Sequence, residues 1–188
     1  SVLLDSVPQT AIVTTSKDPS IFKLLPYSLK PEKTYDVTLT VMVSATATSS
    51  KTKIQLTVTP GNVVASILGG TSNSVRTGST MTLDASKSYD ADIQSKTGVA
   101  AGLSFSWRMY QVGPSYADDC DTDFTFSGLT DEKLLVGALG TASVEAVCQI
   151  AVDIVGSTAT TSARRTATAT VAVSVLPLGT PTINLFLS

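Results

Sequence analysis

The residues in this sequence that could do chemistry are two acidic stretches, one pair of cysteines and one pair of arginines. The first acidic stretch is Asp90-Ala-Asp92, and the second runs from Asp118 to Asp123. Clustered carboxylate oxygens are the ligands that a hard cation such as Ca²⁺ needs, so each stretch could hold calcium. Neither has the spacing of an EF-hand loop, and the same carboxylates also fit solvated loops or turn caps. Both interpretations stay open for Asp90 and Asp92.

Catalysis has little support in the composition. The sequence contains no histidine, which excludes Ser-His-Asp and Cys-His nucleophiles and HExxH zinc sites. A Ser-Lys or carboxylate-only mechanism is left open, but two cysteines are too few ligands for zinc. A net charge of −2 gives no field that would attract nucleic acid, and no apolar run approaches the length of a membrane span. We therefore expect no enzyme activity, no cofactor, no nucleic-acid partner and no membrane span in this segment.

The elements that must position these residues are β-strands. Apolar and polar residues alternate with period two in three clear segments, Tyr35–Val43, Lys53–Val58 and Thr166–Val175. Such alternation is typical of strands that bury one face, and the β-branched residues suit a pleated surface. Gly- and Pro-containing turn signals separate the segments. Short strands at regular spacing predict antiparallel β-sandwiches, with an up-and-down barrel as the alternative.

An internal repeat divides the chain. Lys23–Leu29 aligns with Lys133–Leu139, and the segment that begins at Tyr35 aligns with the one that begins at Cys148. Both tracts end in a strand and a proline, which gives a repeat of about 115 residues. The predicted domains are therefore 1–60, the C-terminal half of one module; 61–177, a complete module; and 178–188, a linker and the first strand of the next module.

The phase of the repeat has a physical consequence. Half of a sandwich would expose its inner apolar face to water, so residues 1–60 should not be stable alone. We expect this chain to be a window from a longer tandem array. The alternative is that a neighbouring chain supplies the missing strands, as in donor-strand complementation.

One stretch of the complete module carries a family resemblance. Gly78–Asp92, with its Leu-Asp-Ala-Ser run, is followed by Leu-Ser-Phe-Ser-Trp ending at Trp107. It resembles the polycystic-kidney-disease (PKD) type immunoglobulin-like domain and, more closely, the receptor-for-egg-jelly (REJ) modules of polycystin-like proteins. Ile93 stands where PKD domains usually have glycine, and Cys148 stands where such families often have tyrosine. The implied fold is all-β, with tandem immunoglobulin-like antiparallel β-sandwiches. Leu83 and Trp107 would point into the core.

The resemblance also bears on the two cysteines. An even count in an immunoglobulin-like unit of extracellular type implies a disulfide between Cys120 and Cys148. It would pin the insertion 112–127 to the penultimate strand, whereas a cytosolic protein would keep two buried thiols. Extracellular Ser/Thr-rich hairpins, Ser44–Thr52 and Ser157–Thr168, could carry O-glycans. The Arg164-Arg165 pair is interpreted as a solvated hairpin tip.

The sequence predicts a structural and adhesive function outside the cell or at its surface. Stacked modules would act as stiff spacers, in a cell-surface, ciliary or filament component, and would contact neighbouring modules or identical subunits. The alternative is a module of a secreted enzyme or receptor that binds a glycan or a protein. That alternative predicts an exposed aromatic platform, whereas the few aromatic residues mostly alternate into the core.

Overall fold

A computed structural model describes residues 1–157 and 164–180 of the chain. The described elements are strands apart from one short 3₁₀ helix, so the predicted all-β fold class is confirmed. The described residues divide into two compact units, residues 1–61 and residues 62–157 with 164–180. Residues 181–188 of the expected segment 178–188, and residues 158–163 of the Ser/Thr-rich hairpin, lie outside the described residues.

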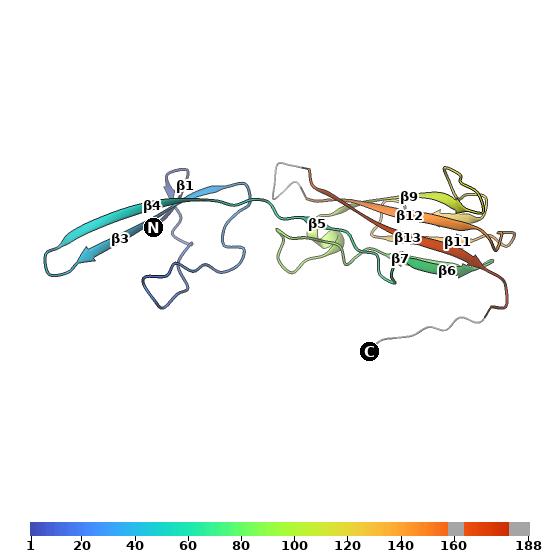
Figure 1. Ribbon diagram of the computed structural model, residues 1–188, viewed down its shortest axis with the longest axis horizontal. Coiled ribbons are helices and arrows are strands. Elements are labelled where there is room, and N and C mark those ends of the chain that lie inside the picture. Colours follow the sequence, from blue (N-terminus) through green and yellow to red (C-terminus); the bar gives the residue numbers. More distant parts are fainter. Residues whose placement is uncertain (158–163, 181–188) are drawn as a thin grey trace. The chain divides into compact units, whose positions relative to one another are not determined.

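The first unit is built around one long hairpin. Strands β3 (Thr34–Val43) and β4 (Thr48–Thr57) pair antiparallel along their whole length, and the short strands β1 (Val2–Leu4) and β2 (Val7–Pro8) extend the sheet in the order β2-β1-β3-β4 (Figure 1). Tyr35 is buried, and its hydroxyl accepts a hydrogen bond of 2.9 Å from the backbone N–H of Lys30. This bond ties the loop before β3 to the sheet, in the manner of the tyrosine corner of immunoglobulin-type folds.

The second unit is a sandwich of two main sheets (Figure 1). One has the strand order β10-β11-β7 and the other β6-β13-β12-β9, and a short β5-β8 pair lies at one end. The elements of this unit are β5 (Val63–Val64), β6 (Ser72–Arg76), β7 (Thr80–Asp84), β8 (Tyr89–Asp90), η1 (Gly98–Ala101), β9 (Ser104–Gly113), β10 (Phe124–Ser127), β11 (Lys133–Ala138), β12 (Val147–Val155) and β13 (Thr166–Leu176).

The core of the second unit lies between the two sheets. Alternate residues of each strand point inward, as the period-two pattern predicts. Leu83 and Trp107 are both buried, which confirms the expectation for these two side chains. The Trp107 indole N–H donates a hydrogen bond of 2.8 Å to the Asp131 carbonyl, so its polar atom is paired inside an apolar surrounding. The Ser86 backbone N–H donates to the Asp84 carboxylate at 2.8 Å, which stabilises the turn after β7.

One strand pairing differs from the antiparallel expectation. Strand β6 runs parallel to β13, with Ala172 opposite Ser72 and Leu176 opposite Arg76. The chain then turns at Thr77–Ser79 into β7, which belongs to the other sheet. The hydrophobic pattern of a five-residue strand sets which face is buried, but it does not set the direction of a partner about 100 residues away.

Candidate functional site

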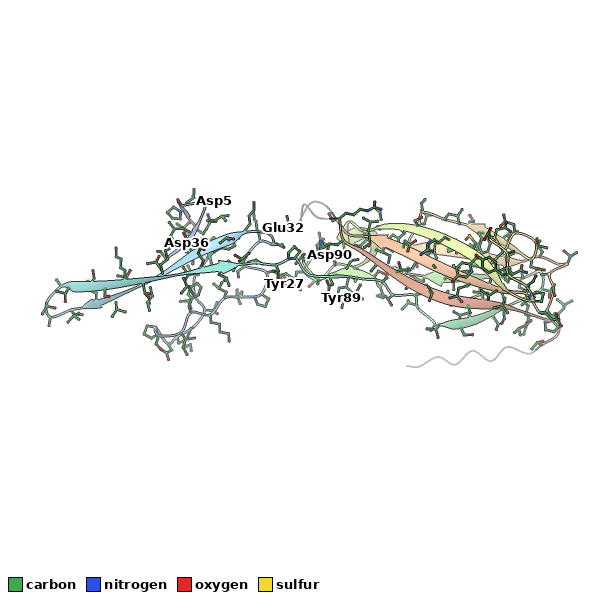
Figure 2. All side chains as sticks on the ribbon, turned by 45° about the horizontal axis from the view of Figure 1, so that its top comes forward. Asp5, Tyr27, Glu32, Asp36, Tyr89 and Asp90 are labelled. Carbon is green, nitrogen blue, oxygen red and sulfur yellow. A yellow bond between two sulfur atoms is a disulfide. The ribbon has the colours of Figure 1, made fainter. Side chains whose placement is uncertain are left out.

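The first acidic stretch lies in the interior of the second unit, where one arginine binds it. Asp90 is in β8 beside Tyr89 (Figure 2), and its carboxylate is fully buried. Arg165 donates from Nη2 to Asp90 Oδ2 at 2.6 Å and from Nη1 to Asp90 Oδ1 at 2.9 Å. The same Nη1 donates to Asp92 Oδ2 at 2.7 Å. The Arg165 guanidinium therefore lies between the two carboxylates that were considered as calcium ligands.

This arrangement corrects the interpretation of Arg165 as part of a solvated tip. Its side chain is only 12% exposed, whereas its neighbour Arg164 is exposed. The reason is electrostatic, because a buried carboxylate is stable only when it is paired and hydrogen-bonded. Asp90 and Arg165 are 75 residues apart, so no local pattern in the sequence could have found the pair.

The second acidic stretch does not gather into one site. Asp123 is buried and accepts a hydrogen bond of 2.7 Å from the Ser143 backbone N–H. Asp119 accepts one of 3.2 Å from the Asp121 backbone N–H, which is a local loop turn. Among residues 1–157 and 164–180, no group of three or more histidine, cysteine or acidic residues is arranged to hold a metal ion. These carboxylates therefore fit the turn-cap interpretation.

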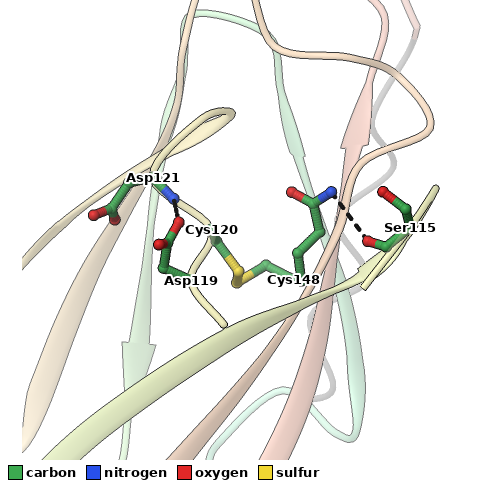
Figure 3. Close-up of a disulfide and its surroundings, with 6 residues drawn as sticks. Ser115, Asp119, Cys120, Asp121 and Cys148 are labelled. Carbon is green, nitrogen blue, oxygen red and sulfur yellow. Dashed lines mark hydrogen bonds between the residues drawn. A yellow bond between two sulfur atoms is a disulfide. The ribbon is translucent and has the colours of Figure 1, made fainter. Parts of the chain in front are cut away.

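A disulfide joins Cys120 to Cys148 and fixes the long loop that follows β9 (Figure 3). Both cysteines are fully buried, and Cys148 lies near the start of β12. Gln111 anchors the other side of the loop, because its side-chain amide donates to the Ser115 carbonyl at 3.2 Å. The insertion is therefore attached to the core at both ends, which restrains the positions of the residues between these attachments.

An aromatic pair joins this loop to β9, where Tyr110 is half-buried. The rings of Tyr110 and Tyr116 lie 6.2 Å apart between centroids and are tilted by 43°. Tyr116 is 70% exposed, and a hydrogen bond from its hydroxyl to the Asp118 carboxylate raises the pKa of Tyr116. Sequence reasoning did not single out this pair, although an exposed aromatic platform is the feature that a ligand-binding module would need.

The outer surface of the β12-containing sheet carries an ion pair between adjacent strands. Arg108 of β9 lies opposite Ala151 and pairs with Asp153 of β12. Hydrogen bonds from Arg108 and then from the Thr168 hydroxyl hold the pKa of Asp153 below its usual value. Burial acts in the opposite direction but is outweighed. The pairing across these strands stabilises a polar outer face and forms no reactive site.

The hairpin of the first unit exposes one apolar face. Tyr35 is buried at its base, but further along this face Leu39 is 50% exposed and Val41 is 58% exposed. The opposite face is polar, and Lys53 there forms a 2.8 Å ion pair with Asp36. The large side chains exposed on the apolar face, here called the hairpin face, are Leu39, Val41, Val43, Ile54 and Leu56.

The corresponding strands of the second unit bury the same positions. In the alignment that pairs Tyr35 with Cys148, Leu39 corresponds to Val152 and Val41 corresponds to Ile154, both of which are fully buried. Strands β7, β10 and β11 cover them, because the two main sheets share one hydrophobic core. The hairpin face is therefore chemically equivalent to a sandwich interior.

A groove runs along part of the hairpin face. A cavity of about 570 Å³ lies between β3–β4 and the segment that joins β2 to β3. Its apolar lining comes from both sides, with Val37, Leu39 and Ile54 from the hairpin and Ile12, Val13, Ile21 and Phe22 from the joining segment. Ile21 and Phe22 are themselves about half exposed. The segment thus covers the base of the hairpin incompletely.

The second unit is a β-sandwich with a disulfide-anchored loop. The match to the REJ domain family extends over residues 4–186, and the chain belongs to this family. No curated protein matches the chain. Among the described residues, the structure contains no helix that is long and apolar enough to cross a membrane.

Three solved structures are similar to the chain at low TM-scores. A nucleoside hydrolase-related protein from Saccharophagus degradans, associated with carbohydrate metabolism, has a TM-score of 0.47 at 20% identity and covers 63% of this chain. Human mucin-like protocadherin EC1-2 scores 0.40 at 12% identity, with 95% of this chain and 84% of that chain covered. The human desmocollin-1 ectodomain scores 0.35 at 13% identity and covers 82% of this chain. This chain spans 26% of the first protein and 29% of the third. With scores this low, none of these likenesses bears on function.

Proposed function

We propose that this chain is a structural and adhesive segment of an extracellular protein, in which REJ-type β-sandwich modules follow one another as a stiff spacer. Membership of the REJ family supports the module type. The buried disulfide supports an oxidising compartment, because disulfides are rare where cytosolic thiols keep cysteines reduced. Within this proposal the protein has no catalytic activity, and a cell-surface, ciliary or filament structure is the setting that a spacer suits.

The observation that carries the proposal is the hairpin face of the first unit. Five large apolar side chains are exposed there, whereas the aligned strands of the second unit bury theirs under β7, β10 and β11. Monomeric proteins rarely leave a contiguous patch of this kind open to water. In the proposed array, an apolar sheet with the composition of β7, β10 and β11 covers the hairpin face and completes a second sandwich of the same family.

Cysteine accessibility tests both the location and the cover. Leu39→Cys and its neighbour Thr40→Cys are introduced separately into the full-length protein on intact cells and treated with a membrane-impermeant maleimide. Leu39 is on the hairpin face and Thr40 on the polar face of the same strand, so the two variants form a matched pair. We expect rapid labelling of Thr40→Cys and protection of Leu39→Cys, because a covered side chain is not accessible to the reagent.

Each other outcome contradicts a stated part of the proposal. Equal labelling of both variants would show that the hairpin face is open and that no neighbouring sheet covers it. Labelling of Thr40→Cys only after permeabilisation would place the segment inside the cell. The wild-type protein gives the background, since both cysteines of this segment are in the disulfide.

A second candidate function, glycan binding, is favoured by the Tyr110–Tyr116 pair. The exposed ring of Tyr116, supported by the half-buried ring of Tyr110, can stack on a sugar ring while a nearby carboxylate such as Asp118 accepts hydroxyl hydrogen bonds. If this function holds, a glycan array should show saturable binding that Tyr116→Ala abolishes and that Tyr89→Ala, at another exposed tyrosine, leaves unchanged. Absence of binding by the wild-type chain would exclude the candidate for the glycans tested.

A further inference from the structure

The first strand of the second unit, β5, is too short for its ladder hydrogen bonds alone to fix its position. Strand β5 consists of Val63 and Val64, and among the described residues its strand partner is the equally short β8. A backbone hydrogen bond of 3.0 Å from Ala91 to the Asn62 carbonyl extends this pairing by one residue. Two-residue ladders are marginal in water, so other contacts must fix the position of β5.

Those contacts converge on the buried carboxylate of Asp90, the residue opposite Val63 in the ladder. Asp90 Oδ1 accepts from the Asp92 backbone N–H at 3.0 Å, in addition to its two bonds from Arg165. Two carboxylates this close repel each other strongly away from water, and the Arg165 guanidinium offsets that repulsion. Without a cation between Asp90 and Asp92, the turn that carries these two residues, here called the acidic corner, would have to open.

The end of β12 is packed close to Asp90. The Gly156 N–H donates to the Arg165 carbonyl at 2.8 Å, which sets the position of the arginine. A Cβ at Gly156 would lie only 2.6 Å from a methyl group of Val63 and 3.5 Å from Asp90 Oδ2. Gly156 therefore approaches both β5 and the buried carboxylate, while Arg165 binds that carboxylate from the position just before β13.

From these contacts we infer that Arg165 is an internal cation that locks strand β5 to the end of the β12–β13 hairpin, and that it occupies the place between Asp90 and Asp92 where a bound Ca²⁺ would otherwise have to lie. The guanidinium satisfies both carboxylates through its fixed planar fork. Its charge is covalently part of the chain, so this junction keeps its structure whatever the free calcium concentration. The inference concerns the second unit alone and does not depend on the adhesive function.

Amide hydrogen exchange of the 188-residue chain tests the inference at the Ala91 N–H, which bonds to Asn62. Arg165→Met keeps the length of the side chain but removes its charge, and Arg164→Met is the matched control at an exposed neighbour. We expect Arg165→Met to raise the exchange rate at Ala91 about tenfold or more, because the acidic corner opens locally. Exchange in the central residues of β12 should stay unchanged, and Arg164→Met should behave as the wild type.

A calcium comparison on the wild-type chain completes the test. We expect the same Ala91 exchange rate in EDTA and in about 1 mM Ca²⁺, a concentration that occupies extracellular calcium modules. Faster exchange in EDTA, or an Arg165→Met rate within about twofold of the wild type, would overturn the inference. If Arg165→Met does not fold, Arg165→Lys decides, because it keeps the charge and loses the planar fork: an unchanged rate, or a rise confined to β5 and β8, supports the lock, while a uniform rise that includes β12 contradicts it.

Discussion

Trp107→Ala is expected to destabilise the second unit by about 3–5 kcal/mol, the range for large-to-small substitution of a buried tryptophan. Trp107 is only 5% exposed and lies opposite Val152 in the neighbouring strand, so its ring fills a large volume between the two sheets. The variant also leaves the Asp131 carbonyl without the indole donor. Urea denaturation followed by circular dichroism measures the loss.

Two further variants separate the causes of this effect. Trp107→Phe keeps much of the ring volume but removes the hydrogen bond to Asp131, and its loss should be smaller, about 1–3 kcal/mol. Ser106→Ala changes the exposed neighbour on the same strand and should stay within about 0.5 kcal/mol of the wild type. A Trp107→Ala variant as stable as Ser106→Ala would contradict the position of Trp107 in the core.

The second large effect is expected for the disulfide. Replacing both Cys120 and Cys148 with alanine should cost about 3–4 kcal/mol, since the bridge closes a loop whose ends are 28 residues apart in sequence. The expected result is a lower urea midpoint and faster proteolysis within residues 112–123, because the loop loses one of its two anchors. Intact mass under reducing and non-reducing conditions confirms the bridge in the wild type beforehand.

The accessibility of the Cys120–Cys148 disulfide to a reductant gives an independent test of its burial. Both cysteines are fully buried, so a mild reductant should leave the disulfide of the folded chain intact and should reduce it only after denaturant is added. Leu68→Ala, at an exposed residue outside the bridged segment 120–148, serves as the control for a simple loss of apolar surface. If the double alanine variant matched this control in stability, the disulfide would not restrain the fold in the way described.

Local patterns were sufficient to predict much of the fold. The period-two alternation of Thr166–Val175 predicted β13 to within one residue, since strand faces are set by neighbours two residues apart. Leu83 and Trp107 were assigned to the core for the same reason. The pairing of Cys120 with Cys148 needed no geometry, because two cysteines allow one intramolecular bond.

The candidate sites were harder to predict, because they depend on residues that are far apart in the sequence. The calcium interpretation of Asp90 and Asp92 rested on the carboxylates alone, and the guanidinium that pairs with them follows 75 residues later. The contact between Tyr110 in β9 and the exposed Tyr116 depends on a loop that the disulfide anchors. In both cases the residue types were visible in the sequence and their partners were not.

The sequence alone was sufficient to predict the strands, the apolar side of each strand, the lack of histidine chemistry in this chain and the family resemblance that the REJ match confirms. Which of these apolar sides are covered depends on the tertiary structure. The alternation that buries Val152 and Ile154 leaves Leu39 and Val41 open, although the aligned strands look alike in sequence. The physical reason is that periodicity is a property of one strand, whereas burial needs a second surface, and that surface is supplied by distant parts of the fold.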